Sequence, residues 1–220
     1  MWCIPEITEE FIARMEHLCN LYAQPYNPKE PVICFDEKSK QLIADTRNPI
    51  PAQAGRPAKS DYEYQRNGTR NIFLAIEPLG GWREATATKR RTKKDFAKEI
   101  YRIVNLARYK DADHINLVMD NLNTHFESSF IETFGEEKAK EILKKLVFHY
   151  TPKHASWLDM AEIELSILSR QALGGKIPTE ANLKSRLRRW QKQRNAKKSK
   201  INWKFTVKDA RSVFKYKVQN

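Results

Sequence analysis

Three acidic residues occupy positions from which their carboxylates can meet. Apolar runs at residues 31–35 and 115–119 are followed at once by Asp36 and Asp120. Both runs have the length and composition of short buried strands. The carboxyl ends of strands in an open α/β sheet border the crevice where ligands bind. Asp36 and Asp120 are therefore predicted to lie at a binding edge of a sheet.

A third acid comes from residues 157–173, which we expect to form a helix. Apolar residues recur there at helical spacing and form one stripe: Leu158, Ala161, Leu165, Leu168 and Ala172. Glu162 borders this stripe, whereas Glu164 is about 200° away around the helix at ~100° per residue. We expect Glu162 to point inward, toward Asp36 and Asp120, and Glu164 to point to solvent.

Carboxylates that lie this close repel one another unless cations neutralise them. A site made only of oxygen ligands suits Mg²⁺, and two such ions can hold the attacking and leaving oxygens of a displacement at phosphorus. Each acid alone has an ordinary structural explanation: a strand-end turn for Asp36, an Asx turn for Asp120 and an ion pair for Glu162. Their joint arrangement favours phosphoryl chemistry.

The charge of the chain suits a nucleic-acid partner. The 220 residues contain 40 Lys and Arg against 27 Asp and Glu, a net charge of +13, and residues 184–217 hold 14 of the basic residues with a single acid, Asp209. Aromatic residues alternate with this charge, which suits contact with a phosphate backbone, although a solvated basic helix would share the pattern. A second basic segment, the proline- and glycine-containing residues 47–71, is expected to be a long loop. The predicted DNA contacts are Arg56, Lys59, Arg66, Arg70, Lys153, Arg188, Arg189, Lys192 and Arg194.

The order of predicted elements indicates an α/β fold with a mixed sheet. Strands at residues 72–77 and 82–88 form a hairpin, and further strands at 115–119 and 146–150 alternate with helices at 93–109, 126–133, 136–145 and 157–173. The three cysteines lack CxxC spacing and are expected to be reduced thiols, so neither a disulfide framework nor a zinc site is indicated. No apolar run approaches the ~20 residues that cross a bilayer, and we expect a soluble, intracellular protein without a membrane partner.

Four stretches together resemble a known family: "CFDEKSKQL", "VMDNLNTH", "YTPKHASWLDMAEIELSILSRQAL" and "INWKFTVKDARSVFK". They are similar to the catalytic domain of DDE transposases of bacterial insertion sequences related to the mariner superfamily. The resemblance implies a ribonuclease H-like mixed sheet flanked by helices, with a basic helical C-terminal tail. It implies a DDE triad of Asp36, Asp120 and Glu162 that binds Mg²⁺ or Mn²⁺, with two ions expected. The implied divisions are an N-terminal helical lead-in at 1–30, a catalytic domain at 31–175 and a DNA-contacting region at 176–220.

The implied activity is hydrolysis of phosphodiesters at transposon ends, followed by attack of the freed 3′-hydroxyl on target DNA. A homodimer on DNA in the bacterial cytoplasm, at the nucleoid, is the setting that the resemblance implies. The alternatives are another ribonuclease H-like nuclease and an inactive transposase-derived DNA-binding protein.

The sequence departs from the family pattern in three ways. The 41 residues between Asp120 and Glu162, 121 to 161, exceed the usual mariner spacing, and we assign the excess to an elaborated helix. Asp159 stands where the family often has asparagine, so a fourth carboxylate is expected near the site. Residues 1–30 have room for one helix and not for a helix-turn-helix, so we expect the chain to be either a fragment or the downstream half of a split or frameshifted gene. In the second case a separate helix-turn-helix polypeptide would recognise the transposon ends.

Overall fold

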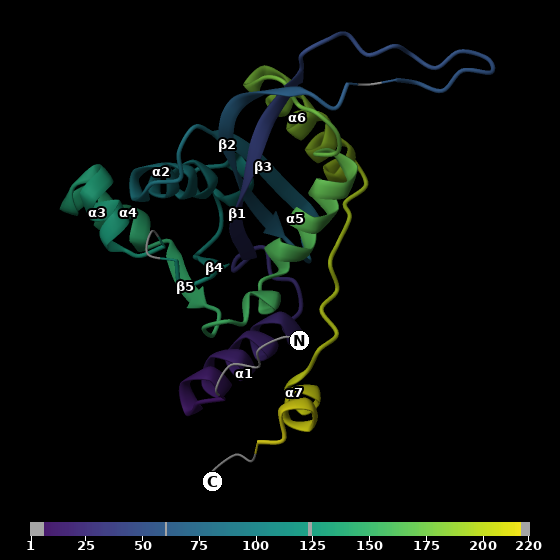
Figure 1. Cartoon of the computed structure of the whole chain (residues 1–220). Helices are drawn as coiled ribbons and strands as arrows, with labels where there is room; N and C mark the ends of the chain where they lie inside the picture. Colours follow the sequence, from purple (N-terminus) through teal and green to yellow (C-terminus); the bar gives the residue numbers. More distant parts are fainter. Residues whose placement is uncertain (1–6, 60, 123–124, 217–220) are drawn as a thin grey trace.

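The fold is a five-stranded mixed sheet with helices on both faces. We describe it from a computed structural model, which places residues 7–59, 61–122 and 125–216 (Figure 1). The strands are β1 (Val32–Asp45), β2 (Tyr64–Glu77), β3 (Trp82–Thr88), β4 (Ile115–Met119) and β5 (Leu146–Tyr150). Their order across the sheet is β3-β2-β1-β4-β5. The first three strands pair antiparallel, whereas β4 and β5 run parallel to β1, so the predicted mixed sheet is confirmed.

Seven α-helices are described around this sheet. They are α1 (Glu9–Ala23), α2 (Lys93–Val104), α3 (Ser128–Phe134), α4 (Glu136–Leu143), α5 (Met160–Gln171), α6 (Glu180–Ala196) and α7 (Val207–Phe214). Helices α3 and α4 account for the long spacing between the second and third acids. Among the described residues, no helix has both the length and the hydropathy needed to cross a membrane.

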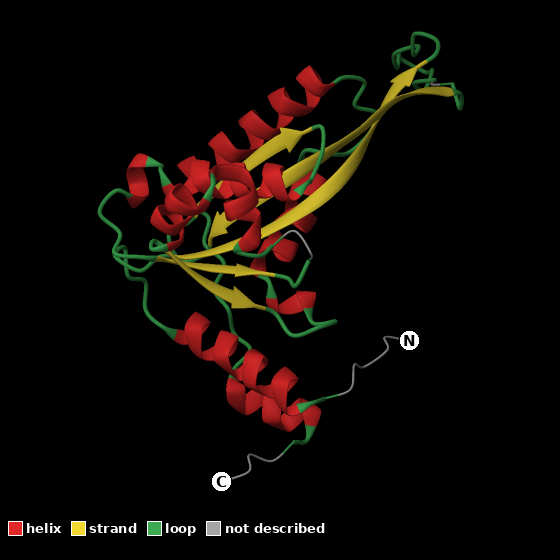
Figure 2. Ribbon diagram, turned by 90° about the vertical axis from the view of Figure 1, so that its left-hand side faces the viewer, coloured by secondary structure: helices red, strands yellow, loops and turns green. Residues whose placement is uncertain are grey.

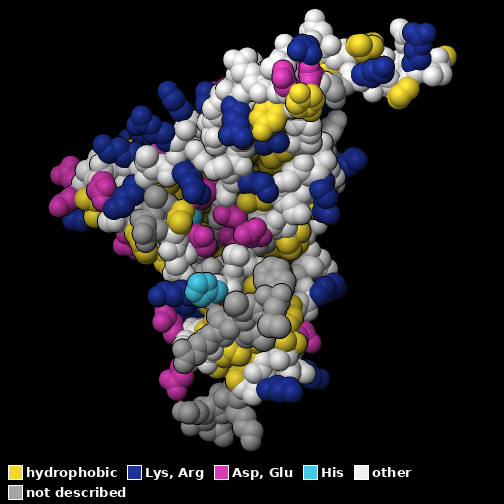
Figure 3. Space-filling view, in the orientation of Figure 1, with side chains coloured by type: hydrophobic (Ala, Val, Ile, Leu, Met, Phe, Trp, Pro, Cys, Tyr) yellow, Lys and Arg dark blue, Asp and Glu magenta, His cyan; other side chains and the backbone are white. Residues whose placement is uncertain are grey.

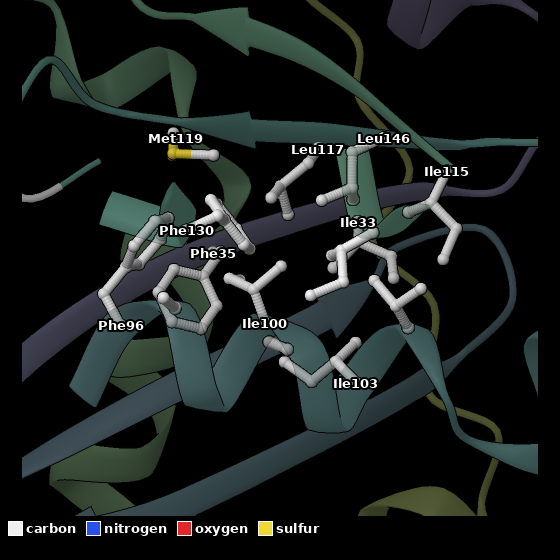
Figure 4. Close-up of a cluster of buried hydrophobic side chains, with 14 of the residues drawn as sticks. Ile33, Phe35, Phe96, Ile100, Ile103, Ile115, Leu117, Met119, Phe130 and Leu146 are labelled. Carbon is white, nitrogen blue, oxygen red and sulfur yellow. The ribbon is translucent and has the colours of Figure 1, made fainter. Parts of the chain in front are cut away.

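One face of the sheet packs against α2, α3 and α4. Strand side chains alternate between faces, and Ile33, Phe35 and Leu117 point to this side. They meet Phe96 and Ile100 of α2, as Figure 4 shows. Helix α2 begins with a capping box in which Thr92 and Asp95 exchange hydrogen bonds, and its apolar spacing ends with Val104.

The opposite face packs against α5 and α6. Leu165 and Leu168 of α5 and Leu183, Leu187 and Trp190 of α6 form one buried cluster with apolar residues of β2 and β3. The basic C-terminal region is therefore not a free tail at this point, because α6 buries three large side chains against the sheet. The rest of the C-terminal region follows an extended path to α7, which lies beside α1 (Figures 1 and 2).

The first strand and the basic loop differ from their predicted bounds. β1 continues to Asp45 instead of ending at Phe35, and β2 begins at Tyr64, within the predicted loop at 47–71. The outer half of β2 is exposed, and it is held by antiparallel pairing with β1. This half of the hairpin is held by backbone hydrogen bonds, which produce no apolar pattern in the sequence. The sequence therefore predicted neither the continuation of β1 beyond Phe35 nor the start of β2 at Tyr64. The remaining loop lies at the tip of a long hairpin that projects from the body (Figure 2).

One glycine is required where two segments approach closely. Gly81, in the turn between β2 and β3, has a φ of +64°, and an added Cβ would lie 2.6 Å from the backbone oxygen of Lys198. A side chain there would both strain the backbone and push away the segment that follows α6.

Candidate active site

The sheet register brings Asp36 and Asp120 to the same level. β1 pairs in parallel with β4 up to Cys34 and Val118, and each aspartate follows two residues later, Asp36 within β1 and Asp120 just after the end of β4. Asp36 is thus within a continuous strand and not at a strand end. β4, the parallel partner of β1, ends at this level, so the edge of the sheet beside Asp36 is open. Both aspartates line a pocket of about 490 Å³ together with Glu162. The acidic side chains gather at the centre of the face shown in Figure 3.

Glu162 reaches this pocket from the first turn of α5. Asp159 caps the helix, because its Oδ1 accepts a hydrogen bond of 2.8 Å from the backbone N–H of Ala161. The cap fixes where the helix begins and therefore where Glu162 points. Glu162 was expected to point inward, but its side chain is exposed and borders the open pocket.

Glu164 does not face solvent, and this prediction was wrong. Its side chain is 0% exposed and lies between two arginines: Arg83 Nε is 2.9 Å and Arg194 Nε 2.6 Å from its Oε1. Glu164 is on the far side of α5 from Glu162, as the helical spacing predicts. That side is covered by β3 and α6, which the spacing within α5 cannot reveal.

Burial and mutual repulsion perturb the acids of the pocket. Burial is the main cause that raises the pKa of Asp36 to about 7, and the charges of Glu162, Glu37 and Asp120 raise it further against one backbone hydrogen bond. Burial, with the charge of Asp36, also raises the pKa of Asp159 well above its ordinary value. The predicted fourth carboxylate, Asp159, is therefore close enough to Asp36 for the Asp36 charge to raise the pKa of Asp159.

Asp120 differs from its neighbours because a histidine contacts it. Burial would raise the pKa of Asp120, but hydrogen bonds from His125 and Leu122 and the His125 charge outweigh burial, and the pKa is lowered. The His125 ring is fully buried between Asp120 and Glu37. The ring therefore lies beneath the open pocket, where it can contact Asp120 but not a ligand in the pocket.

The donor set of the pocket fits a hard divalent cation. Asp36, Asp120 and Glu162 offer only carboxylate oxygens, the ligands that Mg²⁺ and Mn²⁺ prefer. Burial, together with the charges of the neighbouring carboxylates, raises the pKa of Asp36, and a bound cation would oppose both effects by favouring the ionised form. In the described part of the chain no three such side chains stand close enough to enclose one ion, so cation binding requires side-chain rotation.

The predicted DNA contacts divide into cations that pair with acids of the fold and cations that are exposed. Arg70 pairs with Glu180 at 2.5 Å, and Arg194 pairs with the buried Glu164. These two side chains form ion pairs that connect elements of the fold. Lys153 lines a separate pocket with Arg14 and His154. The others are exposed, on the hairpin or on α6: Arg56, Lys59, Arg66, Arg188, Arg189 and Lys192.

A basic corner beside the acids was missed from the sequence. We define this basic corner as residues 89–98, where six of ten residues are Lys or Arg. The corner joins β3 to α2, and Arg91 from it lines the acidic pocket, as does Arg170 of α5. The run of basic residues at 89–98 could have indicated this surface. It was missed because acids elsewhere in residues 1–183 balance these basic residues in the net charge.

Comparison with solved structures identifies the fold as ribonuclease H-like. The Mos1 mariner paired end complex with Mn superposes with a TM-score of 0.54 at 15% identity, covering 90% of this chain and 61% of that chain. A pre-cleavage Mos1 transpososome gives 0.55 at 14% identity, covering 90% and 64%. The Mos1 strand transfer complex gives 0.52 at 15% identity, covering 90% and 61%. The chain thus spans less than two thirds of the length of these transposases.

The sequence itself matches a family. Residues 31–184 match the profile described as DDE superfamily endonuclease. The chain belongs to this family, as its motifs had indicated. A comparison with curated protein sequences gives no significant match.

Proposed function

We propose that the chain is the catalytic domain of a DDE transposase, which hydrolyses phosphodiesters at transposon ends and joins the freed 3′-hydroxyl to target DNA. The observation that carries the proposal is the single pocket lined by Asp36, Asp120 and Glu162, with Arg91 and Arg170 at its side. Membership of the DDE superfamily endonuclease family supports it. The Mos1 structures with a similar fold are complexes with transposon ends or of strand transfer.

In this proposal the three carboxylates bind Mg²⁺ or Mn²⁺, with two ions as the expected number. When bound, such ions lower the pKa of water and stabilise the charge that develops on the attacking and leaving oxygens. Asp36 and Asp120 would contribute from the rigid sheet and Glu162 from the capped start of α5. Arg91 and Arg170 would orient the phosphodiester by charge.

DNA would lie across the exposed cations around the pocket. The basic corner is next to the acids, and the exposed arginines and lysine of α6 and of the hairpin extend the positive surface. Contacts of this kind fix the position of a duplex without reading its sequence. We therefore propose that a helix-turn-helix polypeptide recognises the transposon ends. We also propose that two copies of the catalytic chain assemble on DNA and that the reaction takes place at a bacterial nucleoid.

Strand transfer distinguishes the proposal from its alternatives. Purified protein is incubated with Mg²⁺ or Mn²⁺, with labelled duplexes that carry the ends of the element and with a target plasmid, and products are resolved on denaturing gels. We expect nicked duplexes and labelled joined products, formed with little preference for the element ends in the absence of the helix-turn-helix polypeptide, and both abolished in Glu162→Gln. The control is Glu141→Gln, which alters an exposed acid of α4. Cleavage without joined products would support another nuclease, and binding without cleavage an inactive DNA-binding protein.

A further inference from the structure

A buried histidine connects the acidic pocket to the sheet beneath it. The His125 side chain is 0% exposed, with Nδ1 2.9 Å from Asp120 Oδ1 and Nε2 3.1 Å from Glu37 Oε2. Carboxylate oxygens can only accept hydrogen bonds when ionised, so the ring is the donor toward them. His125 therefore joins two acids that line the pocket, Asp120 and Glu37.

Aromatic neighbours fix the orientation of this ring. The ring centroid of Phe96 lies 4.7 Å from that of His125, and Phe35 makes an edge contact at 6.1 Å. The backbone is fixed as well, because the hydroxyl of Tyr150 donates a 2.7 Å hydrogen bond to the carbonyl oxygen of His125. A ring held on its faces and at its backbone can hold Asp120 in one direction.

Glu37 anchors the far end of the ring. It follows Asp36 on β1, and successive strand side chains point to opposite faces, so it turns toward the same layer as Phe35. Its side chain is 3% exposed, and its Oε1 lies 3.6 Å from Nη1 of Arg91 in the basic corner. A continuous set of contacts thus runs from Arg91 through Glu37 and His125 to Asp120.

The contacts leave one oxygen of Asp120 available. Oδ1 accepts from His125 and also, at 3.1 Å, from the backbone N–H of Leu122. No described residue donates to Oδ2. Asp36 shows the same division, because its Oδ1 accepts a 2.7 Å hydrogen bond from the backbone N–H of Glu37. Each aspartate is held by one oxygen and keeps the other for a ligand.

We propose that His125 is a positioning residue that, anchored by Glu37, holds Asp120 by Oδ1 so that Oδ2 is presented to a divalent cation. The inference rests on the proposed function, since it concerns the cation site of that function. Groups that orient metal ligands through a second hydrogen bond typically contribute 10–100-fold in metal affinity. A residue that only filled space between Phe35 and Phe96 would make no such contribution.

The test measures Mn²⁺ binding directly, by isothermal titration calorimetry of the full chain without DNA. His125→Phe keeps a ring between the aromatic neighbours but removes both donors, and we expect Mn²⁺ affinity to fall by about 10–100-fold. In His125→Asn the amide nitrogen stands near the place of Nδ1, and we expect much of the affinity to be retained. His149→Phe, which alters the other buried histidine among the described residues, should leave affinity unchanged. Circular dichroism and thermal melting monitor the fold of each variant.

Asp120→Asn separates this inference from the proposed function. If Asp120→Asn binds Mn²⁺ as tightly as the wild type, the proposed cation site is wrong. If Asp120→Asn loses binding while a folded His125→Phe retains full affinity, only the role of His125 is overturned. Should His125→Phe fail to fold, His125→Asn is compared with His125→Ala, and equal affinities of these two variants would overturn the proposal.

Discussion

Two glutamates on one helix turn have opposite environments. Glu162 lines the open pocket, and Glu164 is buried between Arg83 and Arg194. The same substitution at the two positions should therefore separate catalysis from stability, although the residues are only two apart.

We expect Glu164→Gln to lower the free energy of unfolding by about 3 kcal/mol, because removing one partner of a buried ion pair leaves the other charge uncompensated. Glu162→Gln should change the free energy of unfolding by less than about 0.5 kcal/mol, since it alters an exposed side chain, while it abolishes cleavage. Urea denaturation measures both. A Glu164→Gln protein as stable as the wild type would show that the two arginines do not depend on this acid.

A buried histidine that does not line the pocket should govern part of the pH dependence of stability. His149 of β5 is buried, and burial, with the nearby charge of His17, lowers its pKa from the ordinary value of 6.5 to about 4. Between these values the unfolded chain binds a proton that the folded chain does not, so the contribution is lost as the pH falls from 6.5 toward 4.

Comparison with His149→Gln isolates this contribution. The difference in melting temperature, wild type minus variant, should decrease as the pH falls from about 6.5 to about 4 and should be constant above pH 7.5. Thermal melts at half-unit intervals of pH provide the measurement. A difference that does not vary with pH would mean that His149 is not neutral in the folded protein.

At the scale of elements, apolar spacing predicted the parts of the fold that are packed. The strand at 115–119 and the stripe of α5 have the predicted bounds or burial because buried side chains define them. The strand at 146–150 also has the predicted bounds, although only Leu146 and His149 of its five residues are buried. The exposed half of the β1–β2 hairpin is defined by backbone pairing instead, and its residues are polar. Asp36 lines one pocket with Asp120 and Glu162, but it lies within β1 and not at the strand end that the sequence predicted.

The site was less predictable where it depends on contacts between distant segments. Spacing within α5 set Glu162 and Glu164 on opposite sides, but the cover over Glu164 comes from α6, 30 residues away at Arg194. His125 was visible in the sequence beside Asp120, but its partner Glu37 is 88 residues away. Both contacts depend on how distant segments of the chain pack against one another in the fold, which a single sequence does not give.

The exposed basic residues of α6 should bind phosphate, and those that pair with acids of the fold should not. We expect the triple variant Arg188→Gln, Arg189→Gln and Lys192→Gln to reduce the salt dependence of duplex binding, by roughly 0.9 log units per log unit of salt for each phosphate that the variant no longer binds. The same triple change at Lys89, Arg90 and Lys94 of the basic corner should have a similar effect. Fluorescence anisotropy with one duplex at several salt concentrations gives the slope. If both variants show the same salt dependence of duplex binding as the wild type, neither surface contacts DNA.

At the scale of the whole molecule, the segment after α6 connects distant parts of the fold. It passes over the turn between β2 and β3, where Gly81 meets the backbone of Lys198, and it ends in α7, which packs on α1 through Phe11 and Phe214 at 6.0 Å. The basic C-terminal region is thus part of the structure as well as a source of charge.

Gly81→Ala should disturb this connection. The added methyl group would require a φ of +64° in a residue with a Cβ and would meet the Lys198 oxygen at 2.6 Å, so we expect the free energy of unfolding to fall by at least about 1 kcal/mol. Gly55→Ala, in the exposed hairpin tip with a φ of +74°, carries the backbone strain without the close approach and is the matched control. Equal effects of the two substitutions in urea denaturation would contradict a specific role for the approach to Lys198.

The central claim is that Asp36, Asp120 and Glu162 form one cation site at the edge of the sheet. Diffraction from crystals grown with Mn²⁺, recorded at a wavelength where manganese scatters anomalously, tests it most directly. We predict an anomalous peak in the pocket, about 2.1 Å from carboxylate oxygens of Asp36 and Asp120, and its disappearance in crystals of Asp120→Asn. Absence of a peak at a Mn²⁺ concentration that supports cleavage, or a peak held by other residues, would contradict the account.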